Sequence, residues 1–258
     1  VFKVGGMGRR IAERLRDPAA IRRARVFPYQ LLSAYYMTGE QVPDIVRDAL
    51  QDALEVALEN VPELPGQVYV LLDVSGSMAS PVTGHRKGAT SKVRCVDVAA
   101  LVAAAISAKN PATEILPFDT QVHAHRLNRR DSVLTNAQTL AKFGGGGTDC
   151  GLPLATLNQR KATGDLVVYV SDNESWADPQ RGRGTETMRQ WEAFRQRNPQ
   201  ARLACIDIQP YGTVQAQTRE DVLNVGGFSD AVFEVLARFA AGQLGGEHWV
   251  REIEAVEV

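Results

Sequence analysis

Residues 67–78 read QVYVLLDVSGSM, and this stretch predicts the fold of the chain. Residues 67–72 are apolar at nearly every position, so both faces of the strand that they form are expected to be buried. Such strands are typical of parallel sheets, which helices cover on both sides. Asp73 follows at the carboxyl end of the strand, and in open α/β sheets this end is where ligands bind.

Three oxygen-bearing side chains stand at alternate positions after this strand, namely Asp73, Ser75 and Ser77. Gly76 lies between the two serines, where it lets the backbone turn sharply. Because Mg²⁺ prefers oxygen ligands in octahedral geometry, the turn is a candidate metal site. Taken alone, the turn has a second interpretation, in which the Asp and Ser side chains bond only to the local backbone.

Two further segments offer oxygen atoms for the same site. Residues 144–147 are consecutive glycines followed by Thr148, and residues 167–171 are a second apolar run that ends beside Asp172. We therefore predict a Mg²⁺ or Mn²⁺ site that is assembled from three loops. Its ligands are Asp73, Ser75, Ser77, Thr148 and Asp172. One coordination position would stay open for a carboxylate or phosphate oxygen of another molecule.

The order of the elements predicts a doubly wound, mostly parallel α/β sheet that follows a short all-helical segment. Further strands are expected at residues 114–118, 166–171, 202–208 and 222–225, and helices at 91–109, 131–142, 185–197 and 229–241. Residues 122–127 alternate in polarity soon after a strand, which indicates an antiparallel edge strand. We divide the chain into helices, residues 1–60, and a sheet domain, residues 61–258, with a proline-containing linker at 61–66.

The first 25 residues are basic although the chain as a whole is not. The chain has 29 Lys and Arg against 30 Asp and Glu, which gives no bulk attraction to nucleic acid. Residues 1–25 carry an excess of six positive charges. This surface is either an ordinary solvated helix face or a contact for RNA phosphates. The candidate RNA contacts are Arg9, Arg10, Arg14, Arg22, Arg23 and Arg25.

Two carboxylates near the glycine loop have structural interpretations. We expect Asp119 to begin a turn and Asp149 to cap the helix that starts near Cys150. The three cysteines are widely spaced and fit neither a disulfide framework nor a zinc site, which favours a reducing, cytoplasmic location. No apolar run approaches the roughly 20 residues needed to cross a membrane, so we expect no membrane partner.

The residues of the candidate site favour binding over catalysis. A phosphotransferase with an aspartyl nucleophile usually carries a second carboxylate two residues later, and Ser75 stands at that position. No G-x-S-x-G motif surrounds the serines, and no Lys follows the glycines as in a P-loop. None of the four histidines lies at an expected strand-to-helix junction. We predict no enzyme activity, and the rival class is a metal-dependent phosphohydrolase.

Three short motifs resemble the metal-ion-dependent adhesion site of von Willebrand factor A domains. They are DVSGS at 73–77, GTD at 147–149 and SDN at 171–173. Four longer stretches are similar to the Ro autoantigen family, also called the TROVE-domain family. They are RVFPYQLL at 25–32, GGTDCGLP at 146–153, SDNESWA at 171–177 and NVGGF at 224–228. The similarity runs from about residue 9 to residue 240.

This resemblance implies a function in small noncoding-RNA binding and quality control. In the family, an A domain closes a ring of helical repeats, misfolded RNAs thread single-stranded ends into the ring, and Y RNAs bind its basic outer surface. The chain has only the last helices of such a ring, so we expect a Y-RNA-like partner to need further repeats. An acidic protein side chain is the expected ligand of the metal. The alternative is a stand-alone protein-interaction module that does not bind RNA.

Overall fold

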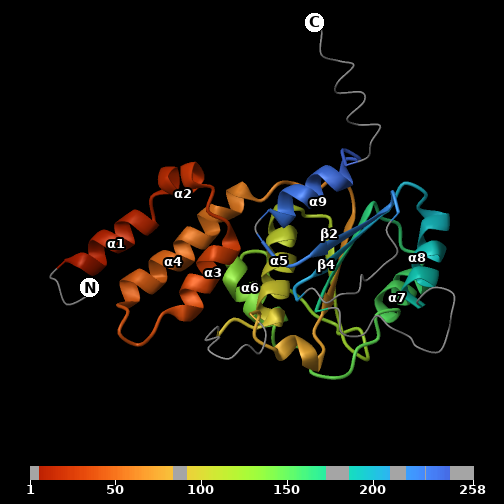
Figure 1. Ribbon diagram of the computed structural model, residues 1–258, viewed down its shortest axis with the longest axis horizontal. Helices are drawn as coiled ribbons and strands as arrows, with labels where there is room; N and C mark the ends of the chain where they lie inside the picture. The colour runs from red at the N-terminus through yellow and green to blue at the C-terminus, as the bar shows by residue number, and fades with distance from the viewer. Residues whose placement is uncertain (1–5, 84–91, 173–185, 210–218, 230, 245–258) are drawn as a thin grey trace, which may run out of the picture.

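One parallel sheet organises the computed structural model, which describes residues 6–83, 92–172, 186–209, 219–229 and 231–244 (Figure 1). The strands are β1 (Val68–Asp73), β2 (Thr113–Phe118), β3 (Leu166–Ser171), β4 (Arg202–Asp207) and β5 (Val222–Gly226). Their order across the sheet is β2-β1-β3-β4-β5, and every pairing is parallel. The predicted doubly wound α/β fold is therefore confirmed.

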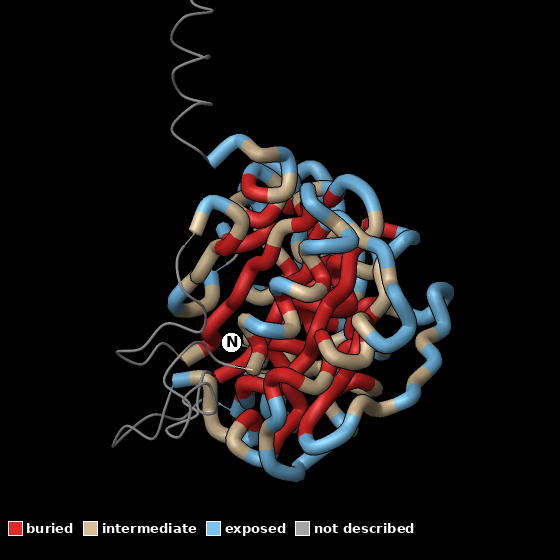
Figure 2. The backbone as a smooth tube through the Cα atoms, turned by 90° about the vertical axis from the view of Figure 1, so that its right-hand side faces the viewer, coloured by how far each residue is buried: buried red, intermediate tan, exposed pale blue. Residues whose placement is uncertain are grey.

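Helices cover both faces of this sheet, and β1 and β3 are buried along their whole length. Buried segments are red in Figure 2 and fill the centre of the molecule. Val68, Val70 and Leu72 of β1 point toward one face, where α5 (Cys95–Lys109) and α9 (Val232–Ala240) contribute to the hydrophobic core. Tyr69 and Leu71 point to the other face, where α7 (Leu152–Gln159) and α8 (Glu186–Arg197) pack. This alternation along β1 explains why its sequence is apolar at successive positions.

In the described part of the chain, four helices precede the sheet and lie on its α5 side, where the third of them packs against α5 (Figure 1). They are α1 (Met7–Leu15), α2 (Pro18–Ala24), α3 (Pro28–Met37) and α4 (Asp44–Ala57), and the 3₁₀ turn η1 (Leu58–Asn60) follows. The sequence pattern did not indicate α2. This short helix begins where the Asp17 carboxylate accepts bonds from Ala19 N and Ala20 N, at 3.0 and 3.2 Å.

The helices and the sheet share one hydrophobic core. Leu32 of α3 and Leu54 of α4 belong to the same buried cluster as Val70 of β1. The expected linker at residues 61–66 is also partly embedded in this core, because Leu64 is only 7% exposed. The backbone N–H of Leu64 donates to Asn110 Oδ1 at 2.6 Å. Residues 61–66 therefore form a connection that is anchored to the sheet domain through Leu64.

The expected antiparallel strand at residues 122–127 is wrong. A single bridge joins Phe118 to Val122, and His123 N donates to Pro117 O at 2.8 Å. Antiparallel partners normally exchange two hydrogen bonds, but Pro117 has no N–H to return. Pairing stops there, and the segment leaves the edge of β2 without forming a ladder.

Several helix ends also differ from the sequence prediction. Helix α5 begins at Cys95, several residues later than expected, because Asp97 Oδ2 accepts a bond from Arg94 N at 2.9 Å and fixes the start. Helix α6 (Val133–Leu140) is shorter than expected, since Ser132 caps it by accepting from Thr135 N at 3.0 Å. Helix α9 is also shorter than expected. Residues 185 and 247–258 lie outside the described residues. Within the described part, no helix has both the length and the apolar character that a membrane span requires.

Candidate metal centre

The candidate site lies where β1 and β3, which are neighbours in the sheet, end side by side. Asp73 is the last residue of β1, and Asp172 directly follows β3. Both side chains are buried, with exposed fractions of 0% and 3%. Burial raises the pKa of Asp73, and the negative charge of Asp172 adds a smaller effect in the same direction, so the two carboxylates are close enough to interact. The fold therefore brings together the two predicted anionic ligands.

Hydrogen bonds fix both carboxylate oxygens of Asp73. Ser75 N donates to Oδ1 at 2.9 Å, and the Ser171 hydroxyl donates to Oδ2 at 2.6 Å. Ser171 was not among the predicted site residues. Its signal in the sequence is a hydroxyl in an otherwise apolar strand, at the position just before Asp172. The orientation of the Asp73 carboxylate is thus set before any ligand binds.

The two predicted serine ligands are also close to each other. Ser75 precedes the 3₁₀ turn η2 (Gly76–Ala79), which contains Ser77. The Oγ atoms of Ser75 and Ser77 are 3.2 Å apart. The turn therefore gathers two neutral oxygens beside the Asp73 carboxylate, as the alternate spacing predicted.

The glycine loop pairs with this turn through its backbone. Gly145 N donates to Val74 O and Gly76 N donates to Gly146 O, both at 2.8 Å. Gly144 has a φ of +79°, and a Cβ atom there would lie 2.0 Å from Val74 O. Only glycine fits so close an approach. The glycines therefore let the loop that carries Thr148 lie against the turn that carries Ser75 and Ser77.

Thr148 is the predicted ligand that the glycine loop carries. Its side chain is partly buried, two residues after the Gly146 carbonyl that bonds to Gly76. No hydrogen bond joins it to the other four predicted ligands among the described residues. The fold thus brings its loop to the site, and within the described residues this loop is held there by backbone bonds rather than by a hydrogen bond of the Thr148 side chain.

Asp119 secures the glycine loop from the end of β2. Its Oδ1 accepts from Gln121 N at 3.0 Å, which confirms the expected turn, and its Oδ2 accepts from Gly146 N at 3.2 Å. Burial raises the pKa of Asp119, but these hydrogen bonds together with the nearby His123 outweigh burial and lower the pKa overall. Asp149 is not the N-cap of α7, because Gly151 occupies that position. Instead, Asp149 Oδ1 accepts from Gly151 N at 3.1 Å.

The buried carboxyl groups at this edge of the sheet have raised pKa values, and such groups suit a bound cation. Burial raises the pKa of Asp73 to about 6, against the hydrogen bonds from Ser171 and Ser75 that lower it. Asp207, the last residue of β4, has its pKa raised to about 7 by burial and then by the charge of Asp172. Buried carboxylates that lack an opposite charge are unfavourable, and a divalent ion would offset this cost.

The predicted donor set consists only of oxygen atoms, from two carboxylates and three hydroxyls. Among the described residues, no group of three His, Cys, Asp or Glu side chains has an arrangement suited to a metal ion. A site here therefore depends on the hydroxyls of the two serines and Thr148 as well as on the carboxylates. This chemistry fits Mg²⁺ or Mn²⁺ rather than a metal that selects thiolate or imidazole.

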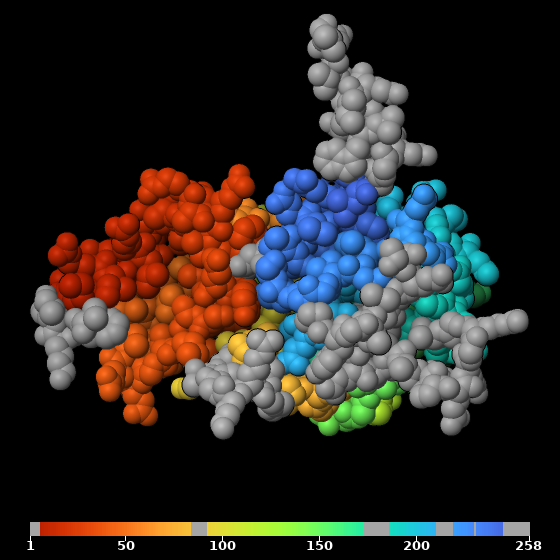
Figure 3. Space-filling view, viewed as in Figure 1, coloured from red at the N-terminus to blue at the C-terminus, as the bar shows by residue number. Residues whose placement is uncertain are grey.

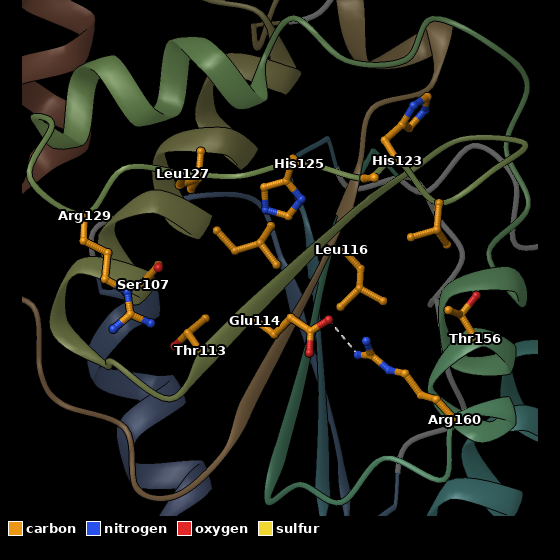
Figure 4. A pocket seen from close by; sticks show the side chains of 13 residues that line it. Ser107, Thr113, Glu114, Leu116, His123, His125, Leu127, Arg129, Thr156 and Arg160 are labelled. Carbon is orange, nitrogen blue, oxygen red and sulfur yellow. Dashed lines mark ion pairs between the residues drawn. The ribbon is translucent and has the colours of Figure 1, made fainter.

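A separate cavity of about 500 Å³ lies along the outer edge of β2 (Figure 4). Glu114 and Arg160 form an ion pair across it at 2.7 Å. His125 lines the same cavity, and burial lowers its pKa. The strand residues of the cavity are at the start of β2, whereas Asp73 pairs in register with Phe118 at the end. The cavity and the candidate metal centre are distinct.

The arginines that were predicted to contact RNA are exposed on α1, α2 and the residue after α2. Arg22 is already paired, because its guanidinium makes two bonds to Glu59, one of them at 2.9 Å. The other five have no ion-pair partner in the described part of the chain. Helices α1 and α2 form the left end of the molecule, away from the η2 turn at its lower edge (Figures 1 and 3). The basic surface and the candidate metal centre are therefore separate.

The parallel sheet and the loops at its carboxyl edge define a von Willebrand factor A domain. The family model of the Ro60 vWA domain matches residues 67–240. The chain belongs to this family, which confirms the resemblance seen in the sequence.

Named relatives agree with this assignment. The RNA-binding protein RO60 of Deinococcus radiodurans is 29% identical over 245 residues, which cover 91% of this chain and 45% of that protein. RNA-binding protein RO60 of Caenorhabditis elegans is 25% identical over 264 residues, covering 91% of this chain and 37% of the relative. The crystal structure of the Deinococcus radiodurans Ro (Rsr) protein matches with a TM-score of 0.75 and 27% identity, over 93% of this chain and 49% of that one. The chain spans less than half the length of these relatives.

Proposed function

We propose that the chain acts as the metal-dependent ligand-binding domain of a cytoplasmic Ro-type protein that binds small noncoding RNA and takes part in its quality control. The observation that carries the metal function is the Asp73 carboxylate. It is fully buried, oriented by Ser75 and Ser171, and adjacent to a second buried carboxylate, Asp172. Support for RNA comes from the names of the relatives.

Each predicted ligand has a defined task in this proposal. Asp73 and Asp172 would hold Mg²⁺ or Mn²⁺, while Ser75, Ser77 and Thr148 would add neutral oxygens. The bound cation would supply positive charge at an open coordination position, where an acidic side chain of a protein partner binds. The few anionic ligands leave the cation able to attract that carboxylate. The chain itself orients the donor oxygens, and the burial of Asp73 and Asp172 keeps most water away from their carboxylates.

Calorimetric titration with Mg²⁺ and Mn²⁺ tests the metal site directly. We expect binding to the wild-type chain and none to the Asp73→Ala variant, with unchanged circular dichroism. Asp48→Ala removes an exposed carboxylate from α4 and is the matched control, which should bind as the wild type does. Equal affinity of the Asp73→Ala variant and the wild type would contradict the assignment.

The RNA function rests on the exposed arginines of the first two helices. Five of them, Arg9, Arg10, Arg14, Arg23 and Arg25, have no ion-pair partner among the described residues. Each phosphate that they neutralise should add about 0.7 to the slope of log affinity against log salt for single strands. Weak binding without sequence preference is expected of this chain. Specific binding of Y-RNA-like partners would need the repeats that the longer relatives supply.

Charge reversal tests this surface without removing packed helices. We expect the triple variant Arg9→Glu, Arg10→Glu and Arg14→Glu to lose single-stranded RNA binding at low salt and to show a smaller salt slope. The control reverses the same number of charges elsewhere, at Arg126, Arg129 and Arg130, which are also exposed. If both triple variants weaken binding equally, the first helix is not the RNA surface.

Two alternative functions have their own tests. The pairing of Arg22 with Glu59 shows that part of the basic surface is neutralised within the chain, which favours a protein-interaction module without RNA binding. No RNA binding by the wild type at low salt would support this module.

A metal-dependent phosphohydrolase is the second alternative. Turnover of generic phosphoesters that is lost in the Asp172→Asn variant would support it.

A further inference from the structure

Asp207 is a buried carboxylate that none of the predicted functions uses. It ends β4, its side chain is 4% exposed, and its Oδ1 has no hydrogen-bond partner in the described part of the chain. Buried polar atoms in folded proteins nearly always have a partner, and an unsatisfied carboxylate oxygen is costly. The position therefore calls for a partner that the protein chain does not provide.

The sheet topology places Asp207 beside the candidate metal centre. It stands opposite Ser171 in the register of β3 and β4, and Ser171 donates to Asp73. Asp172 acts electrostatically on Asp73 on one side and on Asp207 on the other. Backbone bonds hold this end of the sheet, with Gly227 N donating to Asp207 O at 2.7 Å. Three buried carboxylates thus follow one another along the ends of β1, β3 and β4.

Strand spacing decides how Asp207 can reach a cation. Neighbouring strands lie about 4.8 Å apart, so the ends of β1 and β4 are separated by roughly 10 Å. A Mg²⁺ ion would lie about 2.1 Å from an Asp73 oxygen, which favours sites near β1 and β3. The three carboxylates do not form a direct metal-binding group. A water molecule on the ion extends its reach by roughly 2.7 Å, toward β4.

We propose that Asp207 is a further residue of this metal centre, where its Oδ1 accepts a hydrogen bond from a water molecule bound to the cation. The inference rests on the proposed metal-binding function. It makes Asp207 a positioning residue, because it acts on the ion through water. Mg²⁺ keeps several of its waters in proteins, whereas Ca²⁺ takes more oxygen ligands directly. Asp207 therefore favours Mg²⁺ over Ca²⁺.

Calorimetric titration of Mg²⁺ and Ca²⁺ into the whole chain tests this role. Loss of a partner that orients a metal-bound group typically weakens metal affinity by about 10–100-fold. We expect a loss of this size for Mg²⁺ in the Asp207→Ala variant and a smaller loss for Ca²⁺. Asp207→Asn keeps the shape and an acceptor oxygen but not the charge, so its loss should be intermediate. The asparagine variant still gives a measurement if the alanine variant does not fold. Circular dichroism shows whether each variant is folded.

The outcomes separate this inference from the function on which it rests. Wild-type binding of Mg²⁺ that is unchanged in both Asp207 variants overturns the inference and leaves the metal site standing. Complete loss in Asp207→Asn, as in Asp73→Ala, would also overturn it, because Asp207 would then be a direct ligand. A wild-type chain that binds no Mg²⁺ removes the proposed function and the inference together. The Asp48→Ala variant again serves as the control for charge.

Discussion

The Asp73 side chain shows how one residue sets the chemistry of the sheet edge. It has no exposed surface, and two hydrogen bonds from Ser75 and Ser171 replace only part of its hydration. Burial therefore raises its pKa from 3.8 to about 6. Below about pH 6 the protonated form is therefore favoured in the metal-free chain, and a cation that binds the ionised form must compete with that proton there.

The first prediction is a dependence of metal-free stability on pH. Because the folded pKa of Asp73 lies above its unfolded value, its contribution is fully present below pH 3.8 and is lost as the pH rises through 6. A shift of this size corresponds to roughly 3 kcal/mol. Urea unfolding of wild type and Asp73→Asn in a chelator, between pH 4 and 7, measures it. The variant should gain stability relative to the wild type as the pH rises, and a constant difference would contradict the prediction.

A second prediction at this scale concerns two adjacent glycines with positive φ. Gly144→Ala would place a Cβ atom 2.0 Å from Val74 O, whereas a Cβ atom on Gly145 meets nothing within 4 Å. Both variants carry backbone strain, of about 1–3 kcal/mol each. We expect Gly144→Ala to destabilise the chain by clearly more than Gly145→Ala and to weaken Mg²⁺ binding more. Thermal unfolding and calorimetry of the pair measure the difference. Equal effects would mean that the contact with Val74 does not constrain the loop.

At the scale of elements, α4 and α6 are joined by a side chain that acts as a helix cap. Glu55 of α4 accepts a hydrogen bond at 2.7 Å from the N–H of Val133, the first residue of α6. Burial raises the pKa of Glu55, and this hydrogen bond lowers it in part. The bond connects the N-terminal helices to the sheet domain across 78 positions of sequence.

We expect Glu55→Ala to lower the free energy of unfolding by about 1 kcal/mol, the usual effect of losing a helix cap. Glu55→Gln keeps an acceptor oxygen and should lose less. Asp48→Ala, on the exposed face of the same helix, controls for the change in charge and in helix propensity. Urea unfolding compares the three variants. An Asp48→Ala effect as large as that of Glu55→Ala would show that the cap contributes nothing.

The sequence predicted the order of strands and helices because their apolar patterns are local. It also predicted that Asp73, Ser75 and Ser77 come together, since their spacing on one turn decides this. Features that depend on specific backbone and side-chain partners were missed. Pro117 stops an expected edge strand, and Ser171 supplies a bond to Asp73 from another strand. The first effect depends on which residue the segment would pair with, and the second joins residues 98 positions apart, so neither follows from apolar patterns alone. Whether Asp73, Ser75, Ser77, Thr148 and Asp172 hold a metal stays a prediction.

At the scale of the whole molecule, the continuous core predicts that helices and sheet unfold together. Leu54 of α4 is 1% exposed within the cluster that also contains Val70 of β1. We expect Leu54→Ala to lower stability by about 2–5 kcal/mol. Hydrogen exchange should show slow amides of α4 and of β3 losing protection by the same amount. If protection falls only in α1–α4, the two parts unfold as separate units.

The anchored connection at residues 61–66 also fixes how the N-terminal helices are placed relative to the sheet. Leu64 is buried and bonded to Asn110, so this connection cannot serve as a hinge. The exposed arginines of α1 and the η2 turn therefore keep one separation and one relative orientation. A molecule that touches both surfaces at once must match this fixed separation, because the chain does not adjust the distance between them.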